Sequence, residues 1–276
     1  MNCLDSLVKN STDDIKLLIH TDGSLSANDE SSLCLKFGSS VEISDFGSSK
    51  ECALDHLKNR PNCQKIRKES IWGIEFFDPI FAFPNDQISF YLDADILFLR
   101  PFSGLFDREQ VKNGAVFLKD TQWDAYSYRP WQMLTGKSKL KSVKGITTGM
   151  VFWDKKAIDW DYLEWFLGEY RFHQIPEWIM PTAQAGLADR CDAKTISSRH
   201  ITNLYPNAQI HKDTFGVHML SSYRKEWMEK LDAEKYIQGK NSSIIVPSFE
   251  KCVSQNIVGY SFRQMRRWKN TRLNLW

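Results

Sequence analysis

Two carboxylates that could hold a metal ion together, Asp93 and Asp95, lie two positions apart between the apolar runs Phe90–Leu92 and Ile96–Leu99. In an extended strand alternate side chains share a face, so both carboxylates are expected to point the same way and Ala94 the opposite way. Like charges this close repel, and burying them without a counter-charge is unfavourable. A divalent cation such as Mn²⁺ or Mg²⁺ resolves this, because it prefers oxygen ligands, and it commonly holds phosphate groups too. The pair therefore predicts a metal site.

The elements that must position this pair follow from hydrophobic patterning. Short apolar runs predict strands at Ile15–Ile19, Leu33–Phe37, Val41–Ile43, Ile88–Leu92, Ile96–Leu99, Ala115–Leu118 and Met150–Trp153, with an edge strand at Ile244–Val246. Helical periodicity predicts helices over 50–83, broken at Asn59–Asn62, and over Ala157–Tyr170. This alternation favours an α/β domain with a largely parallel sheet, whose sites lie beyond the carboxyl ends of its strands. Both Thr21–Asp22 and Asp93–Asp95 follow such ends.

Composition limits the classes of protein that fit. The net charge of the 276 residues is only +2, so no strong field attracts nucleic acid, and we expect no nucleic-acid partner. The 13% aromatic content suits either a large core or a sugar-binding cleft. The first residues lack the pattern of a signal peptide, and no apolar run is long enough to span a membrane. The six cysteines form no C-x-x-C pair. We therefore expect free thiols and a cytoplasmic, reducing location.

Two segments stand apart from the alternating pattern. Residues 122–144 are polar, aromatic and irregular, which predicts a long loop or small subdomain over the site. The chain ends in a basic stretch with interleaved aromatic residues, 263–272. We expect one domain over 12–238 and a basic, aromatic extension over 239–276, packed on it or used for association. The extension fits a docked helix with a solvated basic face better than nucleic-acid binding or a peripheral membrane or homodimer contact.

The acidic pair and its surroundings resemble a known family. Tyr91–Leu97, followed by Pro101 and Leu105–Phe106, resembles the DxD region of GT-A glycosyltransferases, in particular the retaining, glycogenin-like and galactosyltransferase-like enzymes of the glycosyltransferase 8 type. The resemblance covers roughly residues 15–230, with specific matches in four short patches. It implies a GT-A fold, which is Rossmann-like with a mostly parallel central sheet flanked by helices. It also places Asp95 among the catalytic residues and Ala94 among those that bind the donor.

The second and third patches would border the donor sugar. Gly145–Phe152 is similar to the family's Asn-Ser-Gly segment, although Thr147 and Thr148 replace Asn and Ser, and Thr148 and Gly149 would line the donor. Pro181–Leu187 is similar to the family's Asp-Gln segment, with Ala183 in place of Asp. Gln184 would then be a catalytic residue beneath the donor sugar. Two plainer interpretations stay open, a Thr-Thr-Gly turn into a strand and a helix that begins at Thr182 beside an incidental Gln184.

The fourth patch, Phe215–Trp227, resembles the family's late His-x-x-Gly-x-x-Lys segment. His218 would be the third protein ligand of the metal, and Arg224, with Lys225 beside it, would hold the β-phosphate. A purely structural histidine is the alternative. The remaining resemblance concerns the nucleoside and phosphates, which would be bordered by His20, Thr21, Asp22 and Lys68. Lys65, Arg67 and Lys68 fit a solvated helix face equally well.

The resemblance implies a Mn²⁺- or Mg²⁺-dependent transferase that moves a hexose or pentose from a nucleotide sugar, UDP-linked, to a hydroxyl of a saccharide or glycan. It favours retention, because no patch matches an inverting family. Carboxylates that could serve an inverting reaction as base are Asp124, Glu177 and Asp189. Two other classes stay open: a haloacid-dehalogenase-like phosphohydrolase, which also uses a D-x-D after a strand, and a non-catalytic nucleotide- or carbohydrate-binding protein.

Overall fold

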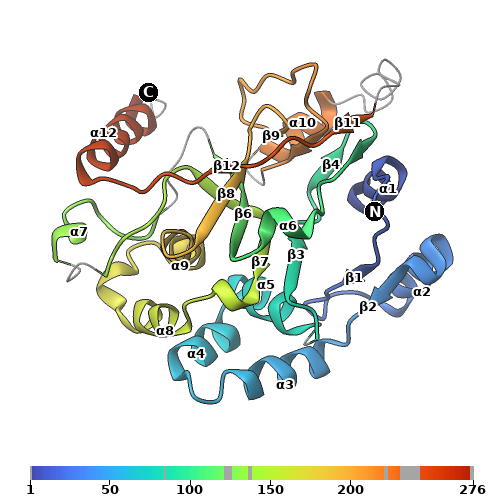
Figure 1. The fold of residues 1–276 in the computed structure, drawn as a ribbon, viewed down its shortest axis with the longest axis horizontal. Coiled ribbons are helices and arrows are strands. Elements are labelled where there is room, and N and C mark those ends of the chain that lie inside the picture. Colours follow the sequence, from blue (N-terminus) through green and yellow to red (C-terminus); the bar gives the residue numbers. More distant parts are fainter. Residues whose placement is uncertain are drawn as a thin grey trace.

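The computed structural model describes residues 2–83, 85–120, 126–135, 139–220, 223–230 and 243–273 (Figure 1). The strands are β1 (Leu17–Ile19), β2 (Val41–Ile43), β3 (Ile88–Leu92), β4 (Ile96–Phe98), β5 (Phe102–Ser103), β6 (Gly114–Lys119), β7 (Ile146–Asp154), β8 (Asp192–Ile196), β9 (Ile201–Asn203), β10 (Gly216–His218), β11 (Ile244–Ile245) and β12 (Glu250–Lys251).

The α-helices are α1 (Asn2–Asn10), α2 (Ala27–Phe37), α3 (Phe46–His56), α4 (Pro61–Glu69), α5 (Ile71–Phe81), α6 (Arg108–Val111), α7 (Gln132–Thr135), α8 (Trp160–Gly168), α9 (Ile179–Ala188), α10 (Arg224–Lys230) and α12 (Ile257–Leu273). Short 3₁₀ helices are η1 (Gly38–Ser40), η2 (Lys155–Ala157), η3 (Tyr170–Phe172) and η4 (Pro176–Trp178). None of the described helices is long and apolar enough to cross a membrane.

The central sheet has the strand order β12-β8-β6-β7-β3. Strands β3, β6 and β8 run in the same direction, whereas β7 and β12 run against them. Smaller sheets pair β1 with β2 in parallel, β10 between β4 and β9, and β11 with β5. The α/β class is therefore confirmed and is consistent with a GT-A fold, with the correction that the sheet is mixed, because β7 is inserted antiparallel between two codirectional strands.

Strands β6 and β7 are buried on both faces, which explains why they are almost uninterrupted apolar runs. Along β6, Ala115 and Phe117 join one hydrophobic cluster with α5, α8 and α9, while Val116 and Leu118 join a second cluster with α1 and β4. Strand β7 alternates in the same way. Strand β3, which the acidic pair follows, is the edge strand of this sheet and pairs with β7 over its whole length, from Ile88 to Leu92.

One predicted strand is wrong, and one predicted helical segment contains a break that was not predicted. Leu33–Phe37 belongs to helix α2, which begins at a capping box formed by Ser26 and Asp29. This start signal outweighs the short apolar run, in which Leu33 is buried and Leu35 is 90% exposed. The predicted helical segment 50–83 is split at Asn59–Asn62 as expected and again at Ser70, giving α3, α4 and α5.

The C-terminal segment is built into the fold where it is described. Strand β11 pairs with β5, and β12 forms the edge of the central sheet against β8. Tyr260 of α12 is fully buried, and its hydroxyl donates to Tyr128 O over 2.7 Å. The predicted boundary between 12–238 and 239–276 lies outside the described residues, so this division stays a prediction.

A buried ion pair ties the end of β1 to the helices beneath it. The Arg67 guanidinium donates to both carboxylate oxygens of Asp78, and the two residues are 1% and 2% exposed. Asp78 also contacts His20 Nε2 over 3.0 Å, and His20 Nδ1 lies 2.8 Å from Ser44 Oγ. Arg67 is therefore not part of a solvated helix face, and the network fixes the chain just before Thr21 and Asp22.

We predict that Arg67→Met lowers the free energy of unfolding by about 3–5 kcal/mol, because Asp78 is left buried with an uncompensated charge. The measurement is urea denaturation followed by circular dichroism. Arg108→Met is the control, since the Arg108–Asp86 pair is exposed and is worth less than ~1 kcal/mol. Equal, small losses in both variants would contradict a buried charged Asp78.

Candidate metal centre

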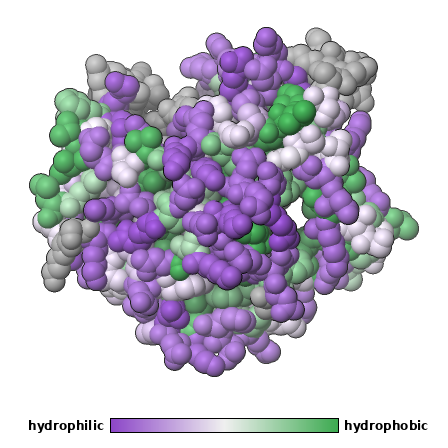
Figure 2. All heavy atoms as spheres, in the orientation of Figure 1, coloured by the Kyte–Doolittle hydropathy of each residue, from purple (hydrophilic) through white to green (hydrophobic). Residues whose placement is uncertain are grey.

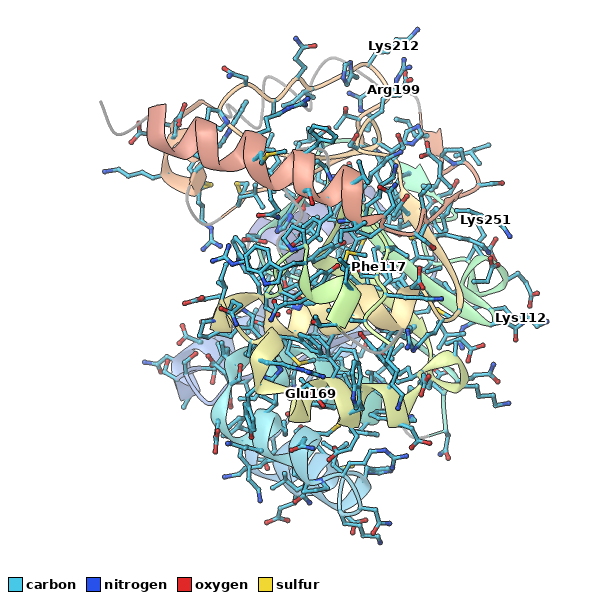
Figure 3. The ribbon with its side chains drawn as sticks, turned by 90° about the vertical axis from the view of Figure 1, so that its left-hand side faces the viewer. Lys112, Phe117, Glu169, Arg199, Lys212 and Lys251 are labelled. Atoms are coloured by element: carbon cyan, nitrogen blue, oxygen red, sulfur yellow. The ribbon has the colours of Figure 1, made fainter. Side chains whose placement is uncertain are left out.

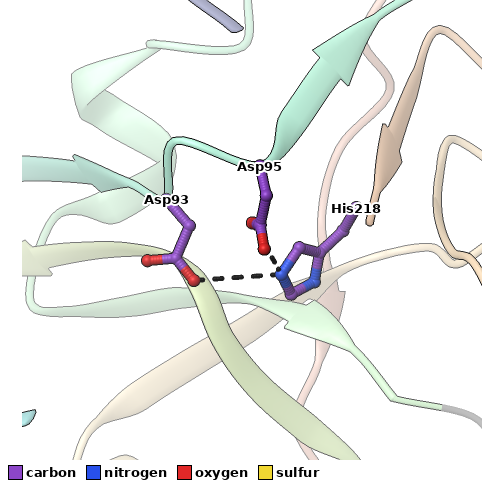
Figure 4. Close-up of side chains that lie close together, drawn as sticks. All are labelled: Asp93, Asp95 and His218. Carbon is purple, nitrogen blue, oxygen red and sulfur yellow. Dashed lines mark ion pairs between the residues drawn. The ribbon is translucent and has the colours of Figure 1, made fainter. Parts of the chain in front are cut away.

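Three side chains that can ligate a metal converge at the carboxyl end of β3 (Figure 4). His218 Nε2 lies 3.2 Å from Asp95 Oδ1 and 3.8 Å from Asp93 Oδ2, and one ligand atom from each residue lies within 4.8 Å of the others. His218 is 5% exposed, whereas the two aspartates are partly open to solvent. The structure therefore brings together the three residues for which the sequence predicts a metal-binding role.

The two carboxylates meet through a turn and not along a strand. Strand β3 ends at Leu92, Ala94 and Asp95 form a turn, and β4 begins at Ile96. The expectation of an extended Asp93–Asp95 segment is therefore wrong, because the Ile96 N–H donates back to Asp93 O over 3.3 Å. The turn still directs both carboxylates to one side, and it leaves Ala94 exposed at its tip.

Strand pairing places His218 next to the acidic turn. Strand β10 lies antiparallel to β4 with His218 opposite Ile96, and parallel to β9 with His218 opposite Asn203. The Met219 N–H donates to Asp95 O over 3.0 Å, which continues the pairing past the turn. The imidazole is thus set against the acidic turn by backbone hydrogen bonds.

The two carboxylates differ in their electrostatics. Burial raises the pKa of Asp93 to about 6, although the Tyr91 hydroxyl donates to its Oδ1 over 2.6 Å and His218 is close by. Burial acts the same way on Asp95, but there His218 and the Arg224 guanidinium outweigh it and lower the pKa. The raised pKa of Asp93 therefore comes chiefly from burial, with a smaller contribution from the charge of Asp95, while Asp95 is held ionised.

The two carboxylate oxygens of Asp95 have different surroundings. Arg224, at the start of α10, donates from a terminal nitrogen to Oδ2 over 2.6 Å. Asp95 Oδ1 is buried and has no hydrogen-bond partner. Arg224 is half exposed, so its remaining donors are open to a ligand, and Lys225 follows it on the exposed surface of α10.

Strand β7 supplies the backbone beside the cluster. Its register against β6 shifts between Phe117 and Leu118, so Thr148–Met150 bulge away from that strand. The Asp93 N–H donates to Gly149 O over 2.8 Å. A Cβ at Gly149 would stand 2.4 Å from the His218 ring, so only glycine fits there.

A cleft borders the cluster on the side of α5 and α9. Gln184 of α9 lines it and is 5% exposed, with Oε1 lacking any hydrogen-bond partner. Trp153 Nε1 is likewise buried and unpartnered at the cleft. Thr182 does not begin the helix, because α9 starts at Ile179 and the Thr182 hydroxyl donates to Trp178 O.

Glu75 of α5 also lines this cleft and was missed by sequence reasoning. Burial raises its pKa to about 7, and the charges of Asp93, Asp95 and Asp22 add to the effect. The available signal was a single acidic residue in the apolar run Ile71–Phe77, since such a charge rarely faces a core without a purpose.

The other predicted site residues lie at varied places. His20 contacts Asp78, and Thr21 is buried. Asp22 accepts a hydrogen bond from Ser24 N over 3.0 Å. The charge of Asp22 also raises the pKa of Glu75. Lys68 is exposed on α4, and no described contact links it to the cluster. Of the carboxylates considered as bases, Asp124 lies outside the described residues.

The donor set fits a divalent metal. Two carboxylate oxygens and a histidine nitrogen suit Mn²⁺, and also Mg²⁺ if water or phosphate oxygens complete the shell. The unpartnered Asp95 Oδ1 is an atom that such a cation would satisfy. Asp93, Asp95 and His218 would therefore hold the metal.

Comparisons with known proteins were made by sequence and by structure. No family model and no curated protein sequence matches the chain. Among solved structures, the apo form of mouse xyloside xylosyltransferase 1 is similar, with 10% sequence identity and a TM-score of 0.48 over 89% of this chain and 90% of that chain. A likeness this distant defines neither family nor activity, so function must be argued from the site.

We predict that Asp93→Asn stabilises the metal-free protein by about 1–2 kcal/mol at about pH 7.5. A carboxyl group whose pKa is raised from 3.8 to about 6 on folding contributes stability that is present below the unfolded value and lost as pH rises through about 6. The gain should therefore vanish near pH 4, as thermal and urea unfolding would show.

Asp95→Asn is the matched control, because the pKa of Asp95 is lowered on folding and its ionised form is already stabilised. This variant should gain nothing at neutral pH. A stabilisation by Asp95→Asn as large as that by Asp93→Asn would contradict the assigned asymmetry.

Proposed function

We propose that this chain is a metal-dependent glycosyltransferase that moves a sugar from a nucleotide sugar, UDP-linked, to a hydroxyl of a saccharide, with retention. The observation that carries the proposal is the cluster of Asp93, Asp95 and His218, together with the hydrogen bond that Arg224 donates to Asp95 Oδ2. A carboxylate–imidazole metal site beside an open guanidinium suits a diphosphate better than a simple anion.

The chemistry of sugar transfer explains why both charges are needed. The sugar–phosphate bond breaks as negative charge develops on the diphosphate leaving group, and a divalent cation held by Asp93, Asp95 and His218 would supply positive charge to offset it. Arg224 would hold the β-phosphate through the donors that Asp95 leaves free, with Lys225 nearby. Asp95 thereby orients the guanidinium as well as binding the metal.

The rest of the donor would extend along the neighbouring strand ends. The proposed nucleoside site is the end of β1, where His20, Thr21 and Asp22 follow the strand. The proposed sugar site is the cleft lined by Thr148 and Gln184, with Gly149 next to Thr148 in the chain. The unpartnered Gln184 Oε1 supports a role in accepting a sugar hydroxyl.

The proposal of retention follows the resemblance to retaining enzymes, and two of the carboxylates considered as bases lie away from the cleft. Glu177 is exposed on η4, and Asp189 caps the end of α9; neither lines the cleft. In a retaining reaction the departing diphosphate oxygen assists the acceptor hydroxyl on the same face, so a separate base is not required. Glu75 is the carboxylate to examine if inversion is found, because it does line the cleft.

The phosphohydrolase alternative is not favoured by any feature of the site. That chemistry needs the second aspartate free to donate and accept a proton. Here Asp95 is bound to Arg224 and held in its ionised form. Hydrolysis of p-nitrophenyl phosphate without transfer from UDP-sugars would nevertheless overturn the assignment.

We predict that Mn²⁺ strengthens UDP binding and that Arg224→Ala weakens Mn²⁺-dependent UDP binding by about 10–100-fold, the scale of a lost charged hydrogen bond. UMP, which lacks the β-phosphate, should be much less affected. Isothermal titration of UDP and UMP, each with Mn²⁺ and with EDTA, provides the measurement.

Arg199→Ala is the matched control, because Arg199 is similarly exposed and paired with Asp213. It should bind both nucleotides like the wild type. Equal UDP affinity with and without Mn²⁺ would refute the proposal that a metal ion at the cluster binds the diphosphate. Tight metal-dependent UDP binding with no sugar transfer would identify the non-catalytic alternative.

A further inference from the structure

The amide of Asn203 has a defined orientation next to the metal cluster. Asn203 is the last residue of β9 and is 5% exposed. Its Nδ2 donates to the backbone oxygen of Lys119 over 3.3 Å, which turns Oδ1 towards His218 Nδ1 at 3.0 Å. The parallel pairing of β9 with β10 sets the two residues side by side.

This orientation decides which imidazole nitrogen keeps a proton. An amide oxygen only accepts hydrogen bonds, so His218 Nδ1 must be the donor. A neutral imidazole has one N–H, and Nε2 is then left with a lone pair. That nitrogen faces the unpartnered Asp95 Oδ1 at 3.2 Å, and the repulsion between the two lone pairs is offset either by a cation bound to both atoms or by a second proton on Nε2.

We propose that Asn203 is a positioning residue for the metal centre, which holds the Nδ1–H form of His218 and so aims the Nε2 lone pair at the metal. Gly149 completes the arrangement, because the His218 ring fills the space that a Cβ at Gly149 would need. The inference rests on the metal-binding part of the proposed function. It adds a role to Asn203, which lies outside the four matching patches.

The first test examines metal-free protein at a pH at which the imidazole is neutral. Long-range ¹H–¹⁵N NMR should show His218 protonated at Nδ1 in the wild type, and a mixture of tautomers in Asn203→Leu. Protonation at Nε2 in the wild type would overturn the inference, whether or not the protein binds metal.

The second test measures Mn²⁺ affinity by electron paramagnetic resonance. Asn203→Leu should bind Mn²⁺ about 10–100-fold more weakly, the usual effect of losing such a partner. Asn203→Asp keeps an accepting oxygen and should restore binding. Thr202→Val, at the neighbouring position of β9, is the control and should bind like the wild type. Wild-type affinity in folded Asn203→Leu would overturn the proposal, while absent Mn²⁺ binding in the wild type with Nδ1 protonated would refute only the metal.

A second inference concerns α12, whose outward face is apolar. Its inner face docks through Tyr260, whereas Val258, Phe262 and Met265 are 61%, 63% and 55% exposed. Residues spaced by three and four positions share one side of a helix. Helix α12 lies across the face shown in Figure 3, and Figure 2 shows apolar residues gathered along the margin where Figure 1 places it. Arg266, four positions after Phe262, is exposed on the same side, and the side chains of the later basic residues lie outside the described part of the chain, so the expected solvated basic face stays a prediction.

The charge of α12 indicates what covers this face. The helix contains no Asp or Glu, and its basic residues are Arg263, Arg266, Arg267, Lys269 and Arg272. A second copy would bring like charges together, whereas an anionic lipid surface would attract them and accept the apolar side chains. We infer that α12 docks the protein on anionic phospholipid.

Vesicle co-sedimentation of the full chain tests this inference. The protein should pellet with phosphatidylcholine vesicles that contain phosphatidylserine, and neither with phosphatidylcholine alone nor at high salt. Phe262→Ser combined with Met265→Ser should reduce binding at least tenfold, because exposed apolar contacts are lost.

Leu35→Ser is the control, since Leu35 is 90% exposed on the unrelated helix α2 and its loss should leave vesicle binding unchanged. Equal pelleting with neutral vesicles, or no pelleting with anionic ones, would overturn the proposal. A dimer detected by light scattering that the α12 variant abolishes would assign this face to a second copy instead.

Discussion

The site depends on one electrostatic constraint, the convergence of three lone-pair-bearing side chains that cannot all be satisfied by one another. Asp95 Oδ1 and His218 Nε2 are 3.2 Å apart, and Asp93 is buried enough for its pKa to rise. Such an arrangement stays unfavourable unless a proton or cation lies between the groups. The fold must therefore supply backbone pairing strong enough to hold them in place.

That backbone pairing comes from the apolar sheet. Strand β7 fixes Asp93 through the Gly149 carbonyl, and β10 brings His218 against the turn. Both strands are anchored by side chains on buried faces, such as Phe152 and Val217. Hydrophobic burial in the sheet thus offsets the local cost of gathering charges at its edge.

The parts of the site that the sequence predicted are those with local signals. The spacing of Asp93 and Asp95 is visible in three residues, and the fold class follows from alternating patterns. The geometry of the acidic turn and the docking of His218 depend on β4–β10 pairing, which no local pattern encodes. Asn203 was missed for the same reason, because its partner His218 lies on another strand. Glu75 did have a local signal, a single acidic residue in an apolar run, but its place in the cleft depends on residues distant in sequence. The strand predicted at Leu33–Phe37 was wrong for another reason. The capping signal of the helix was visible in the sequence, but the prediction relied on the apolar run instead.

The acidic pair consists of two unlike carboxylates, and this difference has a functional meaning. Asp93 accepts from the Tyr91 hydroxyl and carries the energetic cost of burial, so a cation relieves mainly Asp93. Asp95 is stabilised by Arg224 without any ligand. Its Oδ2 accepts a hydrogen bond from Arg224, and its Oδ1 is the oxygen that would bind a cation. Movement of Asp95 would therefore displace both positive charges at once.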